Sequence, residues 1–328
     1  MRNPFDRPSE GSLTQSILVI LRSNIEAMAN KLKYYVESMR LRTLPLAVAG
    51  VIMGGTLATS AGFWQSALFI WAMLTALSLQ ILSNIANELG DLQKGTDNEK
   101  RLGPIRSVQR GNLTAKNLYG LLILFVGLSM TFGASLVGTS FHSLSSLPSL
   151  IMLGLGALAI VAAIKYTFGK KAYGYFGLGD VFVFLFFGWV SVCGIFYLMT
   201  NSLPASVFLP ASSIGLLSTA MLNQNNMRDI SNDTNFEKKT LAVRMGLKSS
   251  KIYHLILIGL AFILMIIYSV MLNVNFWGYL YLLTLPLFIW HVGYVLQNDG
   301  KSLDKHMKII SVGTVLFAVL SGTGFILS

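Results

Sequence analysis

Charged residues are scarce in this sequence: Asp, Glu, Lys and Arg make up 12% of its 328 residues, while apolar residues make up 53%. An ordinary soluble domain carries about twice that share of charge, so this balance excludes a soluble globule and indicates a chain surrounded by lipid. Cysteine and histidine are also rare. The single Cys193 cannot form an intrachain disulfide, and one cysteine with four histidines disfavours a zinc or copper centre.

Long apolar runs fill most of the sequence and are separated by short polar breaks. A helix needs roughly 20 apolar residues to cross a hydrocarbon core, and nine of the runs approach that length. We therefore predict an all-α, polytopic membrane protein with nine transmembrane helices and no separate soluble domain. The predicted spans are 43–60, 65–86, 117–138, 148–168, 180–199, 206–224, 253–272, 276–296 and 308–327.

The charges lie on one side of this predicted topology. All 25 Lys and Arg residues and all 14 Asp and Glu residues lie before the first span or around the loops that follow spans two, four, six and eight. By the positive-inside rule, the sequence predicts a multi-pass protein of the cytoplasmic (inner) membrane, with its N-terminus in the cytoplasm and its C-terminus outside. Orientation and attraction to anionic lipids account for the net charge of +11, so we expect no nucleic-acid partner.

The segment before the first span carries little functional signal. The apolar run 17–21 is too short to cross a membrane, and no small-residue cleavage pattern follows it, so we expect no cleaved signal peptide. Residues 32–39 mix aromatic, apolar and charged side chains, which suits an amphipathic helix at the membrane interface. We therefore divide the chain into a cytoplasmic N-terminal extension, residues 1–41, and a transmembrane domain, residues 42–328.

Two polar stretches lie at the ends of predicted spans on the charged face. The first stretch lies at the end of span two, and its residues at the spacing i, i+3, i+4 and i+7 are Asn84, Asn87, Glu88 and Asp91. They form one stripe if the helix continues to this point. The second stretch lies at the end of span six, and its residues on a shared face are Asn225, Asn226, Asp229 and Asp233. Two rows of oxygen ligands are thus predicted on the same side of the membrane.

Clustered carboxylate and amide oxygens suit a hard cation, and Mg²⁺ is the natural candidate. Mg²⁺ is usually held by one or two carboxylates together with substrate phosphates. Because bare carboxylates repel phosphate, acidic residues beside basic ones predict a diphosphate bridged by metal. The basic residues are Lys100, Arg101 and Arg106 after the first stretch, and Arg228, Lys238, Lys239 and Arg244 within or after the second.

The flanks of the two stretches are alike. Asp97 is followed by Arg101-Leu102-Gly103-Pro104, and Asp233 is followed by Arg244-Met245-Gly246. This short similarity favours an internal duplication that places two metal-binding loops across a pseudo-symmetric cavity.

A third polar stretch, residues 165–180, joins spans four and five and is rich in glycine and aromatic residues. Two interpretations stay open. The stretch is either a structural turn at the membrane interface, or a set of aromatic rings that cradles a carbocation together with lysine and orients an aromatic acceptor. Asp180 favours the second interpretation, because a carboxylate that opens an apolar span is costly unless it is paired or functional.

Together, these residues resemble the UbiA superfamily of intramembrane aromatic prenyltransferases, over nearly the whole chain. Members have nine transmembrane helices and two Asp-rich motifs, N-D-x-x-D-x-x-x-D and D-x-x-x-D, on cytoplasmic loops after helices two and six. Asn87-Glu88-x-x-Asp91 and Asp229-x-x-x-Asp233 match these motifs. The departures are Glu88 where Asp is usual, and a last Asp of the first motif that is delayed to Asp97.

The delayed Asp is similar to the menaquinone branch of the superfamily, whose members carry G-[ST]-D followed by R-x-G-P. Those motifs read Gly95-Thr96-Asp97 and Arg101-Leu102-Gly103-Pro104 here, and residues 173–180 and 225–229 are also similar to that branch. The resemblance implies a UbiA-like fold around a central cavity that opens on the cytoplasmic side. It also implies transfer of an all-trans polyprenyl group from polyprenyl diphosphate to 1,4-dihydroxy-2-naphthoate, with loss of CO₂ and diphosphate, in menaquinone biosynthesis.

The resemblance further implies roles for individual residues. The expected Mg²⁺ ligands, which are also catalytic, are Asp91, Asp97, Asp229 and Asp233, with Glu88 as an alternative to Asp97. The cations expected to stabilise the leaving diphosphate are Arg101, Arg228 and either Lys165 or Lys238. The residues expected to bind substrate are Asn84, Asn87, Glu88, Arg106, Tyr173, Asp180, Asn226, Lys238 and Arg244.

Three alternatives remain open from the sequence. A sister prenyltransferase acting on 4-hydroxybenzoate, haem or a chlorophyll precursor shares the metal chemistry. A secondary transporter also has many spans and buried carboxylates, although its sites typically lie near the membrane midplane. The third alternative is a non-catalytic membrane scaffold, and the two stripes of oxygen ligands argue against it. No protein partner is inferred.

Overall fold

A computed structural model describes residues 31–328 except 97–101, 105 and 170–171, together with Leu18, Val19, Arg22, Met28 and Ala29. Within this part of the chain, nine helical segments are long and apolar enough to cross a membrane, which confirms the predicted number. They are Lys31–Ser60, Ser66–Gln93, Ala115–Phe141, Leu147–Lys165, Gly179–Thr200, Ala205–Arg228, Leu241–Met271, Phe276–Gln297 and Gly300–Leu327.

The first four spans contain η1 (Leu41–Thr43), α2 (Leu44–Ser60), α3 (Ser66–Gln93), α4 (Ala115–Phe141) and α5 (Leu147–Lys165). The short η2 (Tyr173–Phe176) precedes the fifth span, which consists of α6 (Gly179–Val183), the π-helical η3 (Phe184–Cys193) and α7 (Gly194–Thr200). The remaining elements are η4 (Ala205–Val207), α8 (Phe208–Arg228), α9 (Ile230–Asn235), α10 (Leu241–Met271), η5 (Phe276–Thr284), α11 (Leu285–Gln297), η6 (Gly300–His306) and α12 (Met307–Leu327).

Local sequence signals set several of these boundaries. Thr114 caps α4 through a capping box with Asn117, in which each side chain binds the other residue's backbone N–H. The Ser146 side chain accepts a hydrogen bond from the Ser149 backbone N–H at the start of α5. Helical geometry is interrupted in α10 at Gly246, whose φ of 76° is accessible to glycine at little cost. The predicted seventh span, 253–272, therefore covers only the part of α10 beyond this break.

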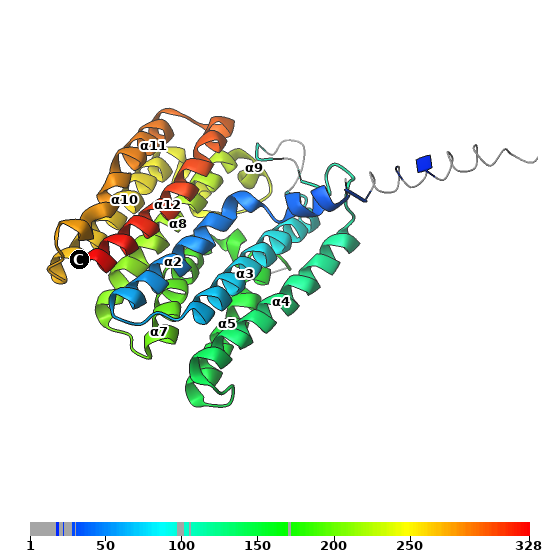
Figure 1. Cartoon of the computed structure of the whole chain (residues 1–328). Coiled ribbons are helices and arrows are strands. Elements are labelled where there is room, and N and C mark those ends of the chain that lie inside the picture. Colours follow the sequence, from blue (N-terminus) through cyan, green and yellow to red (C-terminus); the bar gives the residue numbers. More distant parts are fainter. Residues whose placement is uncertain are drawn as a thin grey trace, which may run out of the picture.

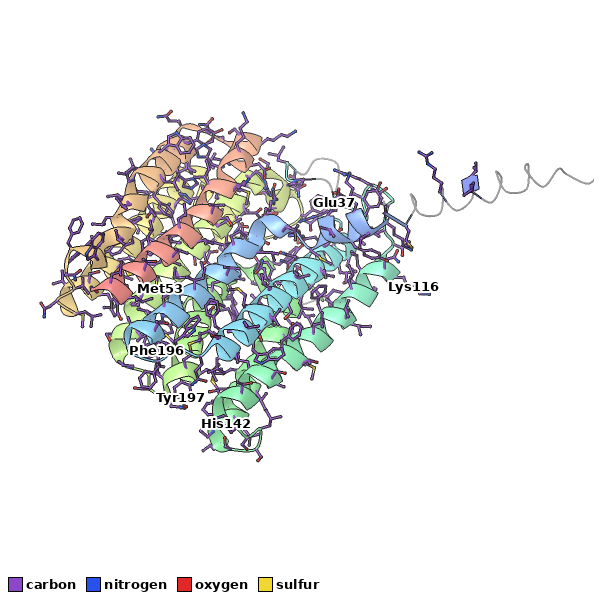
Figure 2. The ribbon with its side chains drawn as sticks, in the orientation of Figure 1. Glu37, Met53, Lys116, His142, Phe196 and Tyr197 are labelled. Carbon is purple, nitrogen blue, oxygen red and sulfur yellow. The ribbon has the colours of Figure 1, made fainter. Side chains whose placement is uncertain are left out.

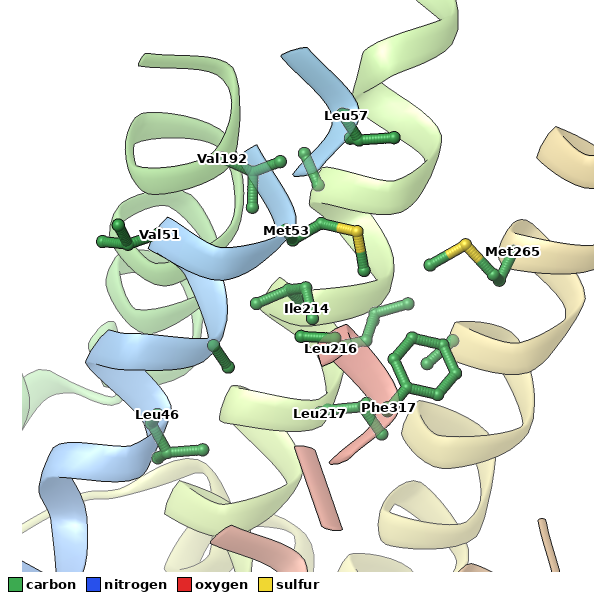
Figure 3. Close-up of a cluster of buried hydrophobic side chains, with 14 of the residues drawn as sticks. Leu46, Val51, Met53, Leu57, Val192, Ile214, Leu216, Leu217, Met265 and Phe317 are labelled. Atoms are coloured by element: carbon green, nitrogen blue, oxygen red, sulfur yellow. The ribbon is translucent and has the colours of Figure 1, made fainter. Parts of the chain in front are cut away.

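Figure 1 shows α2, α8, α10 and α12 in one part of the bundle and α3, α4 and α5 in another, and each part contains a large apolar cluster. The larger joins α2, α8, α10 and α12 with the fifth span, and Figure 3 shows part of it, with Met53, Ile214, Met265 and Phe317 converging from four helices. The smaller joins α3, α4 and α5. The helices of the two clusters enclose the cavity described below.

Small residues allow close approach between helices in the larger cluster. A Cβ built on Gly188 of η3 would lie 2.6 Å from the Ala211 carbonyl oxygen of α8, and a Cβ on Gly215 of α8 would lie 2.7 Å from the Phe184 carbonyl oxygen. Lipid supplies no hydrophobic force between helices, so association depends on such close packing. These two glycines thus fix α8 against the fifth span.

The segment predicted as an amphipathic helix is helical at residues 31–38. Tyr34 and Tyr35 pack against the smaller apolar cluster, the Asn117 amide of α4 donates to the Tyr35 hydroxyl at 3.0 Å, and the Ser107 hydroxyl donates to the Tyr34 carbonyl at 3.1 Å. Its location at a membrane interface and the domain boundary after residue 41 stay predictions.

The two ends of the bundle differ in charge. Figure 2 shows Glu37 and Lys116 at one end, and His142 and Tyr197 at the other. The loops at the second end, residues 61–65, 142–146, 201–204 and 272–275, contain no Asp, Glu, Lys or Arg. The chain is thus a multi-pass membrane protein with one charged end and one uncharged end.

Candidate active site

A cavity of about 920 Å³ runs through the bundle from the charged end. Its polar wall includes Asn84, Asn87 and Asp91 of α3, Asn225 and Asn226 of α8, Asp229, Asp233, Lys238, Arg40 and Arg106. Its longer wall is apolar, comes mainly from α4, α5 and the fifth span, and reaches Leu198 and Leu203 at the uncharged end. One polar pocket therefore opens into a tunnel suited to an extended hydrocarbon.

The first predicted stripe lies on α3, which continues as a helix to Gln93. Asn84, Asn87 and Asp91 line the cavity, while Glu88 is buried elsewhere, with its Oε1 atom unpartnered among the described residues. At about 100° per residue, Glu88 lies roughly 40° from Asn84 and 100° from Asn87, so these two residues mark opposite edges of the stripe. Gln80 and Ser83, which also line the cavity, lie toward the Asn87 edge, so the cavity passes along that edge and leaves Glu88 out.

The second predicted stripe spans a helix end. Asn225 and Asn226 lie in the last turn of α8, Asp229 follows that helix directly, and Asp233 lies in α9. All four line the cavity, as the shared face predicted, and both Asp residues are buried. The chain turn at Asp229 brings the carboxylates of the two stripes to one chamber.

Asp229 is oriented by a buried arginine. The Nε and Nη2 atoms of Arg228 donate to the two carboxylate oxygens of Asp229 at 3.1 and 2.6 Å. Arg228 itself does not line the cavity. This bidentate pair holds the carboxylate in one orientation, because the fork of the guanidinium matches the two oxygens.

Asp91 is held by Tyr175 of η2, which lies between α5 and α6. The Tyr175 hydroxyl donates to Asp91 Oδ1 at 3.0 Å and lies 2.6 Å from the Thr96 hydroxyl. Burial, with Asp91 as a further cause, raises the pKa of Tyr175 above its ordinary value, so the phenol keeps its proton and remains a donor. Neither Tyr175 nor Thr96 was assigned a role from the sequence, although both lie in quoted motifs.

Lys238 lies between the two acidic motifs. Its Nζ atom is 3.7 Å from Asp233 Oδ1 and 3.9 Å from Asp91 Oδ1. Lys94 Nζ lies 3.4 Å above the centre of the Tyr175 ring. The pKa of Lys94 is lowered from its ordinary value. Burial is the main cause, the positive charge of Lys238 adds to it, and the negative charge of Asp91 opposes it. Cations and carboxylates therefore alternate across the mouth of the cavity.

The loops that carry these groups are tied together. The Asn232 amide donates to the Thr96 carbonyl at 3.0 Å, and the Lys239 backbone N–H donates to the Tyr175 carbonyl at 3.1 Å. These bonds join segments that are 136 residues apart in the first case. The two acidic motifs and the loop between α5 and α6 therefore form one connected layer.

Asn84 and Asn87 bind protein groups beside the cavity. The Asn84 amide donates to the Met39 carbonyl at 2.8 Å and to the Thr43 hydroxyl at 2.9 Å. The Asn87 side-chain oxygen accepts from the Thr167 hydroxyl at 3.1 Å. Both amides thus fix neighbouring segments against α3 while their side chains face the cavity.

The third predicted stretch contributes part of the cavity wall. Tyr173 lines the cavity together with Tyr166, and their rings meet edge to face at 5.4 Å between centroids. Burial raises the pKa of both tyrosines above the ordinary value, so both stay neutral. Asp180 is buried outside the cavity lining, beside Tyr253.

Not every sequence-predicted site residue is brought to the cavity. Asn226, Arg106 and Lys238 line it, whereas Lys165 and Arg244 are exposed and do not. Arg244 instead donates to the Phe176 carbonyl at 2.9 Å. The predictions on Asp97, Arg101 and Lys100 lie outside the described residues.

The donor set fits a divalent cation completed by phosphate. Among the described residues, no three carboxylates, imidazoles or thiolates lie close enough to form a metal cage by themselves. Asp91, Asp229 and Asp233 nevertheless face one chamber with amide oxygens and Lys238 beside them. Mg²⁺ is commonly bound in this way, by few carboxylates together with substrate phosphates.

Comparison with known proteins gives a consistent assignment. The UbiA prenyltransferase family matches residues 47–312. A protein of Haemophilus influenzae named 1,4-dihydroxy-2-naphthoate octaprenyltransferase is 40% identical over 304 residues, which cover 90% of this chain and 97% of that protein. The protein of the same name from Escherichia coli is 38% identical over 304 residues, with coverage of 92% and 98%.

The fold is also found among solved structures. A UbiA homologue from Archaeoglobus fulgidus bound to GPP and Mg²⁺ matches with a TM-score of 0.56 at 14% identity, over 88% of this chain and 100% of that one. This likeness supports the arrangement of helices alone. Because the family match covers most of the chain and the two relatives align over nearly all of it, this protein belongs to the UbiA prenyltransferase family.

Proposed function

We propose that this prenyltransferase joins an all-trans polyprenyl group to 1,4-dihydroxy-2-naphthoate, with release of CO₂ and diphosphate, to give demethylmenaquinol. The observation that carries the proposal is a single cavity whose polar chamber opens into a long apolar tunnel. Its support in sequence is the identity of about 40% to proteins named for that acceptor. Membership of a prenyltransferase family favours this function over the transporter and scaffold alternatives.

The polar chamber suits the diphosphate of the donor. We propose that Asp91, Asp229 and Asp233, with Asp97, hold Mg²⁺, which when bound supplies positive charge to the phosphate oxygens. Lys238 Nζ, between Asp91 and Asp233, is placed to donate to the same oxygens. As the bond from the allylic carbon to oxygen breaks, its electron pair leaves with the diphosphate, and these cations stabilise the growing negative charge.

The apolar tunnel suits the donor tail and excludes water. Side chains of α4, α5 and the fifth span line it, and the neutral rings of Tyr166 and Tyr173 line the same cavity. Aromatic faces attract a developing carbocation, and a dry wall keeps water from capturing it. The carboxyl-bearing ring carbon of the acceptor then forms the new carbon–carbon bond, and CO₂ departs, leaving its bonding electron pair to restore the aromatic ring.

The orientation in the membrane is a further part of the proposal. The positive-inside rule places the charged end, and therefore the polar chamber, at the cytoplasmic side of a cytoplasmic (inner) membrane. A soluble aromatic acid can reach this end from the cytoplasm, while the polyprenyl donor resides in lipid. The two substrates therefore approach the chamber from different phases.

An acceptor panel tests the proposal. Purified protein in detergent is given a polyprenyl diphosphate with either 1,4-dihydroxy-2-naphthoate or 4-hydroxybenzoate, in Mg²⁺ and then in EDTA. We expect prenylation of the naphthoate alone, and no product in EDTA. Prenylation of 4-hydroxybenzoate instead would move the protein to a sister branch, and product formed in EDTA would contradict the metal-dependent chemistry.

A further inference from the structure

An ion-pair chain, buried at Asp229 and Arg228 and partly exposed at Asp304 and Arg42, lies behind the acidic motif at the end of α8. Asp304 of η6 accepts hydrogen bonds on its Oδ1 atom from Arg228 Nη1 and, at 3.2 Å, from Arg42 Nη1. Arg228 in turn grips both carboxylate oxygens of Asp229. Asp304 does not line the cavity, whereas Asp229 does. The ion-pair chain therefore connects η6 to the cavity through Arg228.

The guanidinium of Arg228 is fully engaged. Besides Asp229 and Asp304, it donates to Asn225 Oδ1 at 2.8 Å and contacts Met307 Sδ at 3.1 Å, and its side chain is 0% exposed. A buried charge with this many directed partners has one favourable position. The two bonds from Arg228 fix the orientation of the Asp229 carboxylate at the cavity.

The position of Asp304 is itself fixed by its neighbours. The Gln224 amide of α8 donates to the carbonyl of Leu303 at 2.7 Å. His306 stacks on the Tyr294 ring with 3.7 Å between centroids. These contacts hold η6 against α8 and α11 independently of the ion pairs. Asp304 is therefore presented to Arg228 by a rigid segment.

Charge balance gives Asp304 a function that geometry alone does not. With Asp304, two arginines, Arg42 and Arg228, face two carboxylates, and their formal charges cancel. Without it, the ion-pair chain would hold two arginines and the single carboxylate of Asp229, so a divalent cation at Asp229 would meet more uncompensated positive charge behind that ligand. The released arm of Arg228 would also be free to turn toward the carboxylates of the chamber.

We propose that Asp304 is a positioning residue that acts through Arg228, keeping Asp229 oriented and sufficiently negative to bind the divalent cation of the reaction. This inference rests on the proposed function, because it assumes that Asp229 is a metal ligand. It assigns a role to the connection between α11 and α12, which the acidic motifs do not include. Outer partners of metal ligands typically change metal affinity roughly 10- to 100-fold when removed.

Binding of Mn²⁺ to the full-length protein in detergent, followed by the EPR signal of the free ion, tests this role without relying on turnover. Asp304→Asn is expected to raise the dissociation constant of Mn²⁺ roughly 10-fold. This is the low end of that range, because Asp304 contacts Arg228 rather than the ligand Asp229 itself. The matched control is Asp299→Asn, which breaks the ion pair of a nearby exposed aspartate with Lys251. The control is expected to bind Mn²⁺ as the wild type does.

Arg42→Gln separates charge balance from a merely structural bridge. This change leaves the bond between Asp304 and Arg228 in place and removes a positive charge, so Mn²⁺ affinity should stay equal or increase. A structural bridge between η1 and η6 predicts a loss of affinity instead. This variant also decides the question if Asp304→Asn does not fold: weaker Mn²⁺ binding by Arg42→Gln refutes the proposal, and unchanged or tighter binding supports it.

The remaining outcomes are equally distinct. Wild-type Mn²⁺ affinity in folded Asp304→Asn, or an equal loss in Asp299→Asn, overturns the role of Asp304 while leaving the proposed function intact. No Mn²⁺ binding by the wild-type protein overturns the metal site itself, and with it both proposals.

Discussion

Gly90 offers a direct test of how closely the acidic motif of α3 must be held. A Cβ at this position would lie 2.6 Å from the carbonyl carbon, carbonyl oxygen and hydroxyl oxygen of Thr167, whereas ordinary contacts begin at 3.4 Å. Because two of these atoms are backbone, no side-chain rotation can relieve the clash. Gly90→Ala must therefore push α3 and the segment after α5 apart at the residue next to Asp91.

The expected cost has two parts. Overpacking of this kind typically destabilises by about 1–3 kcal/mol, which should lower the apparent unfolding temperature. A displacement on the order of 1 Å at catalytic groups can reduce activity by roughly 100-fold. The clash also breaks the alignment of the Thr167 hydroxyl with Asn87. We expect kcat/KM to fall by roughly 10- to 100-fold.

The control is Gly120→Ala in α4, where nothing lies within 4 Å of the added Cβ. Alanine is favoured over glycine inside a helix by about 1 kcal/mol, so this variant should be at least as stable as the wild type and equally active. Prenyl transfer and thermal unfolding are measured on both variants in the same detergent. Wild-type activity in Gly90→Ala, with unchanged unfolding, would refute the close-packing argument.

Three further predictions follow from the layer at the mouth of the cavity. Tyr175→Phe removes a hydrogen bond to a charged carboxylate, worth about 1.5–3 kcal/mol, so kcat/KM measured in the transfer assay should fall roughly 10- to 100-fold. Lys238→Gln should raise the KM for the diphosphate donor, while Lys239→Gln, which changes an exposed neighbouring side chain, should not; equal effects would contradict the placement of Lys238. The raised pKa of buried Tyr175 contributes stability that is complete below the unfolded-state pKa of about 10 and is lost as the pH rises above it. Thermal unfolding at increasing pH should therefore show a fall above that value, and a fall of equal size in Tyr175→Phe would argue against a contribution from this phenol.

Much of the fold could be predicted because its signals are local. Apolar runs predicted the nine spans, and the charged residues predicted which ends share one side. The spacing of Asn84, Asn87 and Asp91 predicted their common face, because α3 continues as a regular helix through them. Glu88 has the same local spacing signal, but it lies on the edge of the stripe away from Asn87, and the cavity follows the Asn87 edge.

Other features depend on contacts between distant segments. Tyr175 meets Asp91 across 84 residues, and Asp304 meets Arg228 across 76. No periodicity in either segment indicates these partners, so the sequence left both residues without a role. Lys165 and Arg244 show the converse: each is a basic residue near a motif in sequence, yet the end of α5 and the start of α10 direct them outside the cavity lining.

The central claim is that the polar chamber and apolar tunnel of this protein join a polyprenyl group to the carboxyl-bearing carbon of 1,4-dihydroxy-2-naphthoate. The most direct test uses acceptor labelled with ¹³C in its carboxyl group, a polyprenyl diphosphate and Mg²⁺, and quantifies labelled CO₂ and prenylated product together. The account predicts equal amounts of the two, with no label left in the product. A prenylated product that retains the labelled carboxyl group, or no prenylated product from folded protein, would contradict it.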